Sequence, residues 1–181
     1  WLFLSATCLI FIFYELKFHF LALAQTKWIL VALRRHCPQL PLNPALRLGT
    51  LKLPFAYQLG IFAQGMKNKW TEINYIEICS GPGRCIDRQC GAEFDGTALS
   101  ILQHSAAQYI KNALFFDYDT TVVDVLNKRI EQLGCTNAAA FIGDYNNPRS
   151  ICDIISKRIS QTRSLNLVLL DPTDCSVPFE L

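Results

Sequence analysis

The chain of 181 residues has the length of one domain of ordinary size, and its 51% hydrophobic content is enough for a buried core. Only 18% of the residues are charged, and the formal net charge is +2. This near-neutral balance argues against a protein that binds nucleic acid tightly through its overall charge. A local basic groove is still compatible with this balance, because three basic residues lie near the glycine-rich stretch 80–84: Lys67, Lys69 and Arg84.

Eight cysteines are spread along the chain without a Cys-x-x-Cys pair or a zinc-type spacing. We therefore predict no metal site, and reduced thiols in a cytoplasmic protein. Cys79 and Cys152 lie in apolar runs, where cysteine behaves as a small hydrophobic residue. Cys85 and Cys90 flank a polar loop, where a reactive or metal-binding pair is the alternative.

The N-terminal run WLFLSATCLIFIFY is almost wholly apolar and is followed by Glu15 and Lys17. It is shorter than the ~20 residues that a membrane-spanning helix needs. Three interpretations compete: a helix packed on the domain, a membrane anchor, or a wrongly chosen start. We favour the first or the third, because the rest of the chain has the character of a cytoplasmic protein.

The segment before residue 73 is predicted to be apolar and helical. Residues 21–36 have the spacing of an amphipathic helix with a basic end, which Pro38 and Pro41 stop. Residues 38–54 hold four prolines and are expected to be irregular, whereas residues 55–70 are expected to form a short helix. We thus divide the chain into an N-terminal segment, 1–72, and a second domain, 73–181.

Strands and helices alternate in the second domain. Apolar runs predict strands over 75–79, 113–116, 138–142 and 165–170, and helical spacing predicts helices over 97–110, 120–134 and 147–159. This alternation is typical of an α/β domain with a parallel sheet, whose strands all end at one edge. Ligands of open α/β sheets bind at that edge.

A glycine turn follows the first of these strands, in the stretch NYIEICSGPGRC. Gly81 and Gly83 allow positive φ and let the backbone approach a ligand, although a simple tight turn is the alternative. A dinucleotide fingerprint has a third glycine shortly after, whereas here the thirteen residues 84–96 separate Gly83 from the expected helix. Because a pyrophosphate needs the helix N-terminus close behind the turn, we expect a ligand without one, and S-adenosylmethionine fits.

Acidic residues end the other predicted strands. Asp117 occupies the position that binds a ribose diol in nucleotide-binding α/β domains, with a cap for the next helix as the alternative. Asp144 either accepts the adenine amino group or caps a helix. Asp171 lies beside the first strand in the expected order 3-2-1-4, where it orients or deprotonates a methyl acceptor or else forms a structural Asp-Pro turn.

These motifs together resemble a known family. The strand with Glu77 and the turn from Ser80 to Arg84 resemble motif I of Rossmann-like methyltransferases and, more narrowly, the three-Cys-motif partner family, TcmP. The stretch GAEFDGTALSIL is similar to that family's insert, although Thr97-Ala98 replaces Ser-Pro. FFDYD, IGDYNN and LLDPTD fall where the family carries its second-strand acid, its Gly-Asp-x-Asn and its Asp-Pro.

The resemblance implies a Rossmann-like methyltransferase sheet that binds S-adenosylmethionine. It also implies a radical-enzyme-like three-Cys-motif protein as partner, and a bacterial or archaeal cytoplasm. The chain ends ten residues after Asp171, so we expect a fragment whose sheet stops after the fourth strand. We assign Asp171 as the catalytic residue and the following residues to the cofactor: Glu77, Ser80, Gly81, Gly83, Asp117 and Asp144.

Two functions fit this interpretation. The first is a methyltransferase whose acceptor is unknown, nucleic acid being one candidate. The second is a non-catalytic partner module that keeps the methyltransferase fold. The shortened chain and the lack of an Asn-Pro-Pro-Tyr or Asp-Pro-Pro-Tyr motif favour the second.

Overall fold

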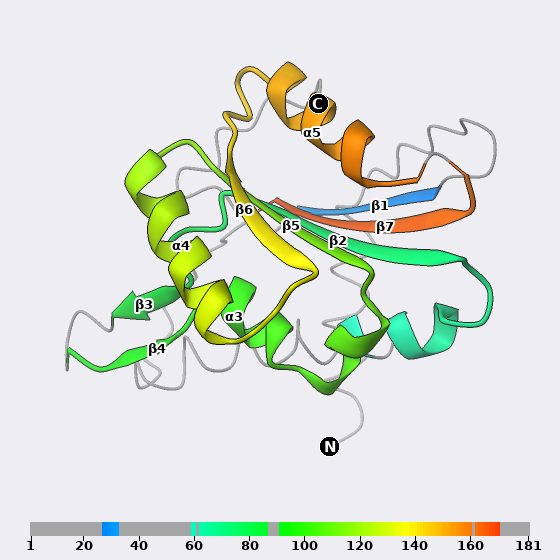
Figure 1. Cartoon of the computed structure of the whole chain (residues 1–181), viewed down its shortest axis with the longest axis horizontal. Coiled ribbons are helices and arrows are strands. Elements are labelled where there is room, and N and C mark those ends of the chain that lie inside the picture. Colours follow the sequence, from blue (N-terminus) through cyan, green and yellow to red (C-terminus); the bar gives the residue numbers. More distant parts are fainter. Residues whose placement is uncertain (1–26, 33–58, 61, 87–90, 161, 171–181) are drawn as a thin grey trace, which may run out of the picture.

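The structure of the chain is a computed structural model that describes residues 27–32, 59–60, 62–86, 91–160 and 162–170. Its main sheet contains β1 (Lys27–Ala32), β2 (Glu72–Ile78), β5 (Asn112–Asp117), β6 (Ala138–Ile142) and β7 (Ser164–Leu170). The helices are α3 (Thr97–Leu102), the 3-10 helix η1 (Ser105–Tyr109), α4 (Thr120–Gln132) and α5 (Arg149–Arg158). A separate hairpin consists of β3 (Arg84–Ile86) and β4 (Glu93–Asp95) (Figure 1).

The five strands of the main sheet lie in the order β1-β7-β2-β5-β6, and every neighbouring pair is parallel. The α/β class predicted from the sequence is therefore confirmed. The four strands expected in the second domain lie side by side as β6-β5-β2-β7, so β2 has a partner on each side. All strands end at one edge of the sheet, on the left in Figure 1, which we call the carboxyl edge.

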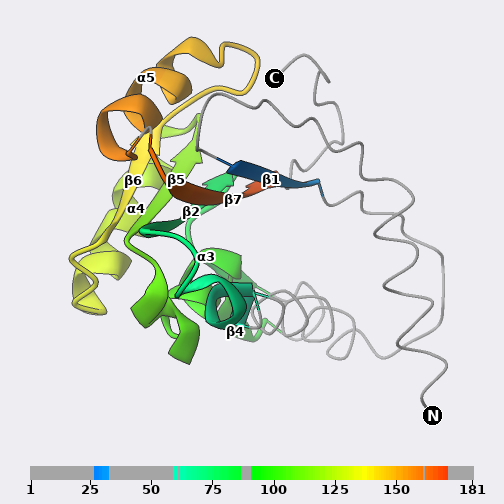
Figure 2. The same cartoon turned by 90° about the vertical axis from the view of Figure 1, so that its right-hand side faces the viewer.

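Helices cover both faces of the sheet, and each face has its own hydrophobic core (Figure 2). On one face, α3 and α4 pack Leu99, Ile101 and Leu126 against Tyr75 and Phe115. On the other face, α5 packs onto the alternate residues of the same strands, with this set buried: Ile76, Ile78, Leu114, Phe116, Ile151 and Ile159. Burial on both faces explains why the centre of β5, residues 113–116, is apolar without alternation, and why β2 is buried at all seven positions.

The predicted helix over residues 21–36 is wrong in the part that the structure describes, because residues 27–32 form β1. Its residues pair with β7 in parallel register, from Lys27 opposite Leu165 to Ala32 opposite Leu170. The sequence KWILVA combines aromatic and β-branched residues, which suit a strand as well as they suit an apolar helix. The strand is favoured because β7 would otherwise have one edge unpaired, and pairing with β1 provides hydrogen-bond partners for the backbone groups along that edge.

The predicted helix over residues 97–110 is broken into α3 and η1. His104 interrupts it with extended backbone angles, and its Nδ1 accepts a hydrogen bond from the Ala106 N–H at 3.1 Å. The imidazole ring fills the space beside Gly60, where a Cβ would lie 2.6 Å from His104 Cε1. Residues 59–60 and 62–66 are helical, in agreement with the short helix expected between residues 55 and 70.

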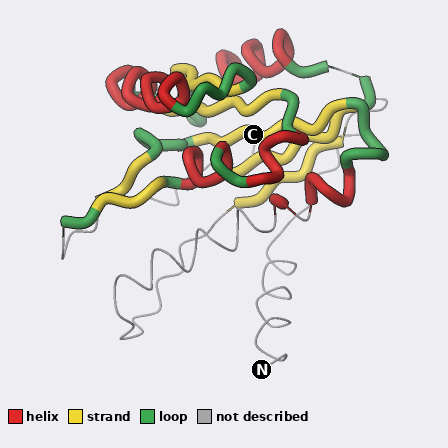
Figure 3. Tube along the Cα trace, turned by 60° about the horizontal axis from the view of Figure 1, so that its bottom comes forward, coloured by secondary structure: helices red, strands yellow, loops and turns green. Residues whose placement is uncertain are grey.

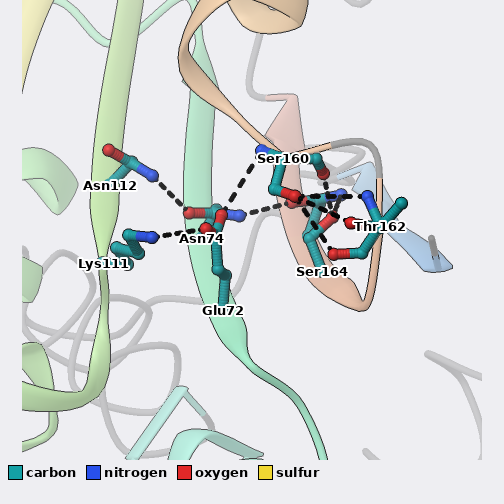
Figure 4. Close-up of polar contacts among 8 residues, drawn as sticks. Glu72, Asn74, Lys111, Asn112, Ser160, Thr162 and Ser164 are labelled. Carbon is teal, nitrogen blue, oxygen red and sulfur yellow. Dashed lines mark hydrogen bonds and ion pairs between the residues drawn. The ribbon is translucent and has the colours of Figure 1, made fainter. Parts of the chain in front are cut away.

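A ladder of polar side chains crosses the three central strands (Figure 4). Asn112 Nδ2 donates to Asn74 Oδ1, and Asn74 Nδ2 donates to Asn166 Oδ1, each at 2.8 Å. Asn166 Nδ2 continues to Ser164 Oγ at 3.3 Å, and that hydroxyl donates to the Ser160 carbonyl oxygen at 2.8 Å. Asn74 and Asn166 are completely buried, so these bonds require one register of β5, β2 and β7.

A second polar group lies next to the ladder, at the start of β2. Glu72 accepts hydrogen bonds from the Lys111 ammonium and from the Ser160 N–H. It thereby connects the residue before β5 with the loop before β7. The starts of all three central strands are fixed by side-chain contacts in addition to the backbone ladder (Figure 4).

Replacing Asn74 with alanine is expected to lower the free energy of unfolding by about 2–4 kcal/mol, because it leaves Asn112 Nδ2 and Asn166 Oδ1 without partners. Urea unfolding followed by circular dichroism measures the loss. The matched control is Asn68→Ala in an exposed turn, which should change the value by no more than about 0.5 kcal/mol. Equal effects of the two substitutions would contradict the role of the ladder.

Candidate functional site

The glycine turn at the end of β2 lies against the end of β5. The Ser80 N–H donates to the Phe116 carbonyl oxygen, and the Gly81 N–H donates to Asp117 Oδ2, both at 3.0 Å. Cys79 enters the turn with a φ of 66°, which is uncommon for a residue with a side chain and bends the chain sharply out of the strand. The topology thus brings together the turn and the acid of the neighbouring strand.

Both carboxylate oxygens of Asp117 are engaged, but its accepting capacity is not exhausted. Oδ2 accepts from the Gly81 N–H, and Oδ1 accepts from the Asp119 N–H at 3.1 Å. A carboxylate has about four acceptor positions, so about two remain. Asp117 does not cap α4, because that role belongs to Asp119, whose Oδ1 accepts from Thr121 N–H at 2.7 Å and from Val122 N–H at 3.4 Å.

The two glycines of the turn have different surroundings. Gly81 and Gly83 both have positive φ, of 64° and 82°. A Cβ on Gly83 would lie 2.8 Å from Leu126 Cδ1 and 3.0 Å from Leu99 Cγ, whereas a Cβ on Gly81 would meet no atom within 4 Å. Gly83 therefore packs on the helices below the sheet, and Gly81 faces open space where a ligand has room.

Residues 84–96 do not separate the turn from the next helix, contrary to our expectation. The Gly96 N–H donates to the Gly83 carbonyl oxygen at 2.6 Å, so the two ends of the stretch meet. The residues between them leave the main body as the β3–β4 hairpin, which projects from the carboxyl edge (Figure 3). Arg84 pairs with Glu93 and Asp95 across the base of the hairpin, and α3 begins directly behind the turn.

The approach of Gly83 and Gly96 explains why two glycines are needed. A Cβ on Gly96 would lie 2.8 Å from the Gly83 carbonyl oxygen. Arg129 of α4 donates to the Pro82 carbonyl oxygen and holds the turn from the other side. Neither Gly96 nor Arg129 was predicted from the sequence, although the glycine just before a helical pattern was a usable signal.

The side chain of Ser80 lies at the end of β2 and carries a buried hydroxyl group. Its Oγ is buried, and the part of the chain that the structure describes offers it no hydrogen bond. A buried hydroxyl of this kind destabilises the folded protein unless it forms a hydrogen bond with a ligand or a water molecule. Its position, next to Gly81 at the end of β2, makes it a candidate ligand contact.

Two of the predicted site residues make hydrogen bonds to side chains near them in the sequence. Glu77 is only 2% exposed on the face that α3 and α4 cover, and its Oε2 accepts from the Tyr75 hydroxyl at 2.9 Å. Asp144 is exposed beyond β6, and its Oδ1 accepts from the Asn146 N–H at 2.8 Å and from Asn146 Nδ2 at 3.1 Å. Asp171 lies outside the described residues.

Two exposed apolar side chains accompany Asp117 at the carboxyl edge. Tyr118 is 74% exposed and follows Asp117 directly, and Ile142 is 54% exposed in the register position opposite Asp117 on β6. The Gly143 N–H donates to the Asp117 carbonyl oxygen at 2.9 Å, which holds the two segments together. Neither side chain was predicted to belong to the site, because periodicity assigns apolar residues at strand ends to the core.

The cysteine assignments need one correction. Cys79 packs against the core beneath α5, but Cys152 is exposed on that helix and is not a buried hydrophobic residue. In the described ranges, no cluster of three or more histidine, cysteine or acidic side chains has an arrangement that would hold a metal ion. Nor do those ranges contain a helix with the length and hydropathy of a membrane span.

The chain was also compared with known proteins. No protein-family model matches it, and no curated protein matches it at a significant level. The function of the chain is therefore inferred from the geometry of the carboxyl edge.

Replacing Gly83 with alanine is expected to lower the free energy of unfolding by about 2–4 kcal/mol, because positive φ and overpacking against Leu126 act together. Gly81→Ala carries only the backbone penalty, about 1–2 kcal/mol, because its side is open. Thermal and urea unfolding of the two variants measure the difference. A Gly81 variant as unstable as the Gly83 variant would contradict the open space beside Gly81.

Proposed function

We propose that the carboxyl edge of this α/β domain binds S-adenosylmethionine. The observation that carries the proposal is the 3.0 Å hydrogen bond from the Gly81 N–H to Asp117 Oδ2, because it brings a glycine turn and a strand-end acid into contact. Nucleoside ligands of open α/β sheets bind between two such elements. The methyltransferase-like fold and the resemblance to the TcmP family belong to the same proposal.

The surroundings of Asp117 suit an adenosyl group. Its remaining acceptor positions take the two hydroxyl groups of a ribose, which a carboxylate binds side by side. Tyr118 and Ile142 present exposed apolar surface on either side of the acid, and a flat adenine ring covers such surface favourably. Ser80 Oγ and the open side of Gly81 are left for the amino-acid part of the ligand.

The helix behind the turn argues against a dinucleotide. A pyrophosphate binds to free N–H groups in the first helical turn. Ala98 and Leu99, the second and third residues of α3, are 0% and 3% exposed, so their N–H groups are not available to a large anion. The preference for a ligand without a diphosphate therefore rests on the burial of these N–H groups. It no longer rests on the length of the stretch 84–96, because Gly83 and Gly96 are in contact.

Methyl transfer is the activity that such a site supports. The sulfonium group of the cofactor already activates the methyl group, so the protein mainly positions an acceptor. Asp171, directly after β7, is proposed to orient or deprotonate that acceptor. Leu170 pairs with Ile78 at the end of β2, so Asp171 follows a strand that ends beside the turn.

The second candidate is a binding module that keeps the fold without turnover. The observation that favours it is the burial of Glu77 and the local engagement of Asp144, which leave fewer polar groups at the carboxyl edge than expected. In this version the partner is a three-Cys-motif protein in the cytoplasm, as the family resemblance suggests.

Calorimetric titration with S-adenosylmethionine and S-adenosylhomocysteine tests the cofactor site. Tyr118→Ala is expected to weaken binding by about tenfold, because adenine loses its apolar contact with the tyrosine ring, which is 74% exposed in the free protein. Asp117→Asn is expected to weaken binding by at least about tenfold through the lost charge. The control Asp124→Asn removes the same charge from the exposed side of α4 and should leave affinity unchanged.

The results separate the candidates. Tight binding of NADH without binding of S-adenosylmethionine would refute the proposed ligand. Binding of S-adenosylmethionine without methyl transfer to RNA, DNA or protein acceptors would favour the binding module. Methyl transfer that is lost in Asp117→Asn but kept in Asp124→Asn would establish the enzyme.

A further inference from the structure

The opposite edge of the sheet, where the strands begin, carries a cavity. It has a volume of about 220 Å³, opens to solvent and lies between the chain that enters β2 and the chain that enters β5. Figure 1 shows these two segments together at the right-hand end of the sheet. We call this cavity the amino-edge pocket, and it is lined by Lys67, Trp70, Thr71, Gln108, Tyr109 and Lys111, with Ile73 and Ile110 at its base.

Charge is segregated between the two edges of the sheet. The described loops that precede the strands, residues 67–71, 110–111, 133–137, 159–160 and 162–163, contain four basic residues and no acid. The described loops that follow β5 and β6, residues 118–119 and 143–148, contain acids and no base. The loops around the amino-edge pocket therefore carry an excess of positive charge, of which Glu72 offsets one unit through its ion pair with Lys111.

The ammonium groups in the pocket have donors to spare. Lys67 Nζ donates to the Tyr109 hydroxyl at 3.3 Å, and Lys111 Nζ pairs with Glu72. Each ammonium has three donors, and these contacts use one of them. The Lys67 side chain is exposed, and that of Lys111 is 59% exposed, so both can reach an anion at the mouth of the pocket.

The aromatic side chains supply a stacking surface beside the charges. Lys67 Nζ lies 4.6 Å from the centre of the Tyr109 ring and 3.3 Å from its hydroxyl, so the ammonium makes a cation–π contact near the hydroxyl end of the ring. An incoming phosphate competes for this ammonium and leaves the ring face to a base. Trp70 adds a second half-buried aromatic surface from the other wall.

We infer that the amino-edge pocket binds single-stranded nucleic acid, with one base on Tyr109 and the neighbouring phosphate on Lys67. Aromatic rings between basic side chains are the usual means of binding single strands without sequence preference. The volume of about 220 Å³ is below the usual range for a complete small-molecule site, so the pocket takes one base and leaves the rest of the strand on the basic edge.

This site is separate from the proposed cofactor site. The seven residues of β2 lie between the two edges, which corresponds to about 20 Å at ~3.3 Å per residue. The inference does not rest on the cofactor proposal, and the two are measured with different ligands. A failure of one leaves the other unaffected.

Fluorescence anisotropy with a labelled 12-residue uridine oligomer tests the inference at several salt concentrations. For the parent protein we expect binding that weakens with salt, with a slope of about −0.7 for each phosphate contact. Lys67→Gln should reduce this slope by about 0.7, and Tyr109→Leu should weaken binding by about tenfold. The control Lys128→Gln removes a lysine from the exposed side of α4, outside the pocket, and should change neither value.

Circular dichroism verifies that the variants are folded. Failure of the parent to bind the oligomer at low salt would overturn the inference. An equal effect of Lys128→Gln and Lys67→Gln would also overturn it, because binding would then follow overall charge. Uridine monophosphate that binds as tightly as the oligomer would show that the pocket takes a free nucleotide instead of a strand.

Discussion

The parallel pairing of β2 with both β5 and β7 is the constraint on which the rest of the structure depends. All seven residues of β2 are buried, so the strand has to satisfy its polar groups inside the sheet. The backbone ladders do this on both sides, and Asn74 extends the bonding into the side chains. Because this pairing fixes where β2 and β5 end, it also fixes the contact between Gly81 and Asp117.

The two edges of the sheet carry different chemistry as a consequence of the same topology. Parallel strands direct every following loop to one edge and every preceding loop to the other. Here the following loops carry turn glycines and acids, and the preceding loops carry lysines and aromatic residues. The proposed cofactor site and the proposed nucleic-acid site therefore occupy opposite ends of one central strand and share its rigidity.

Much of the second domain could be predicted from sequence because β2, β5, β6 and β7 contain short apolar stretches separated by helical patterns. The buried polar residues within β2 and β7, such as Asn74 and Asn166, could not be paired from the sequence alone. The N-terminal strand could not, because KWILVA fits a helix or a strand until β7 offers it an edge. The contact between Asp117 and the glycine turn could be predicted, because parallel neighbouring strands end at the same edge of a sheet. The burial of Glu77 was not predicted, although strand alternation places it on the same face as Tyr75, beneath the helices.

The narrow base of the β3–β4 hairpin has a consequence for how such chains are compared. Where Gly83 and Gly96 meet, the chain returns to its starting point, so the residues between them add length without displacing anything behind them. A sequence motif with a fixed spacing between glycines treats Gly83 and Gly96 as thirteen residues apart. In the structure the two residues are joined by a hydrogen bond. A comparison that skips from the first glycine to the last would align this chain with domains that have no hairpin at all.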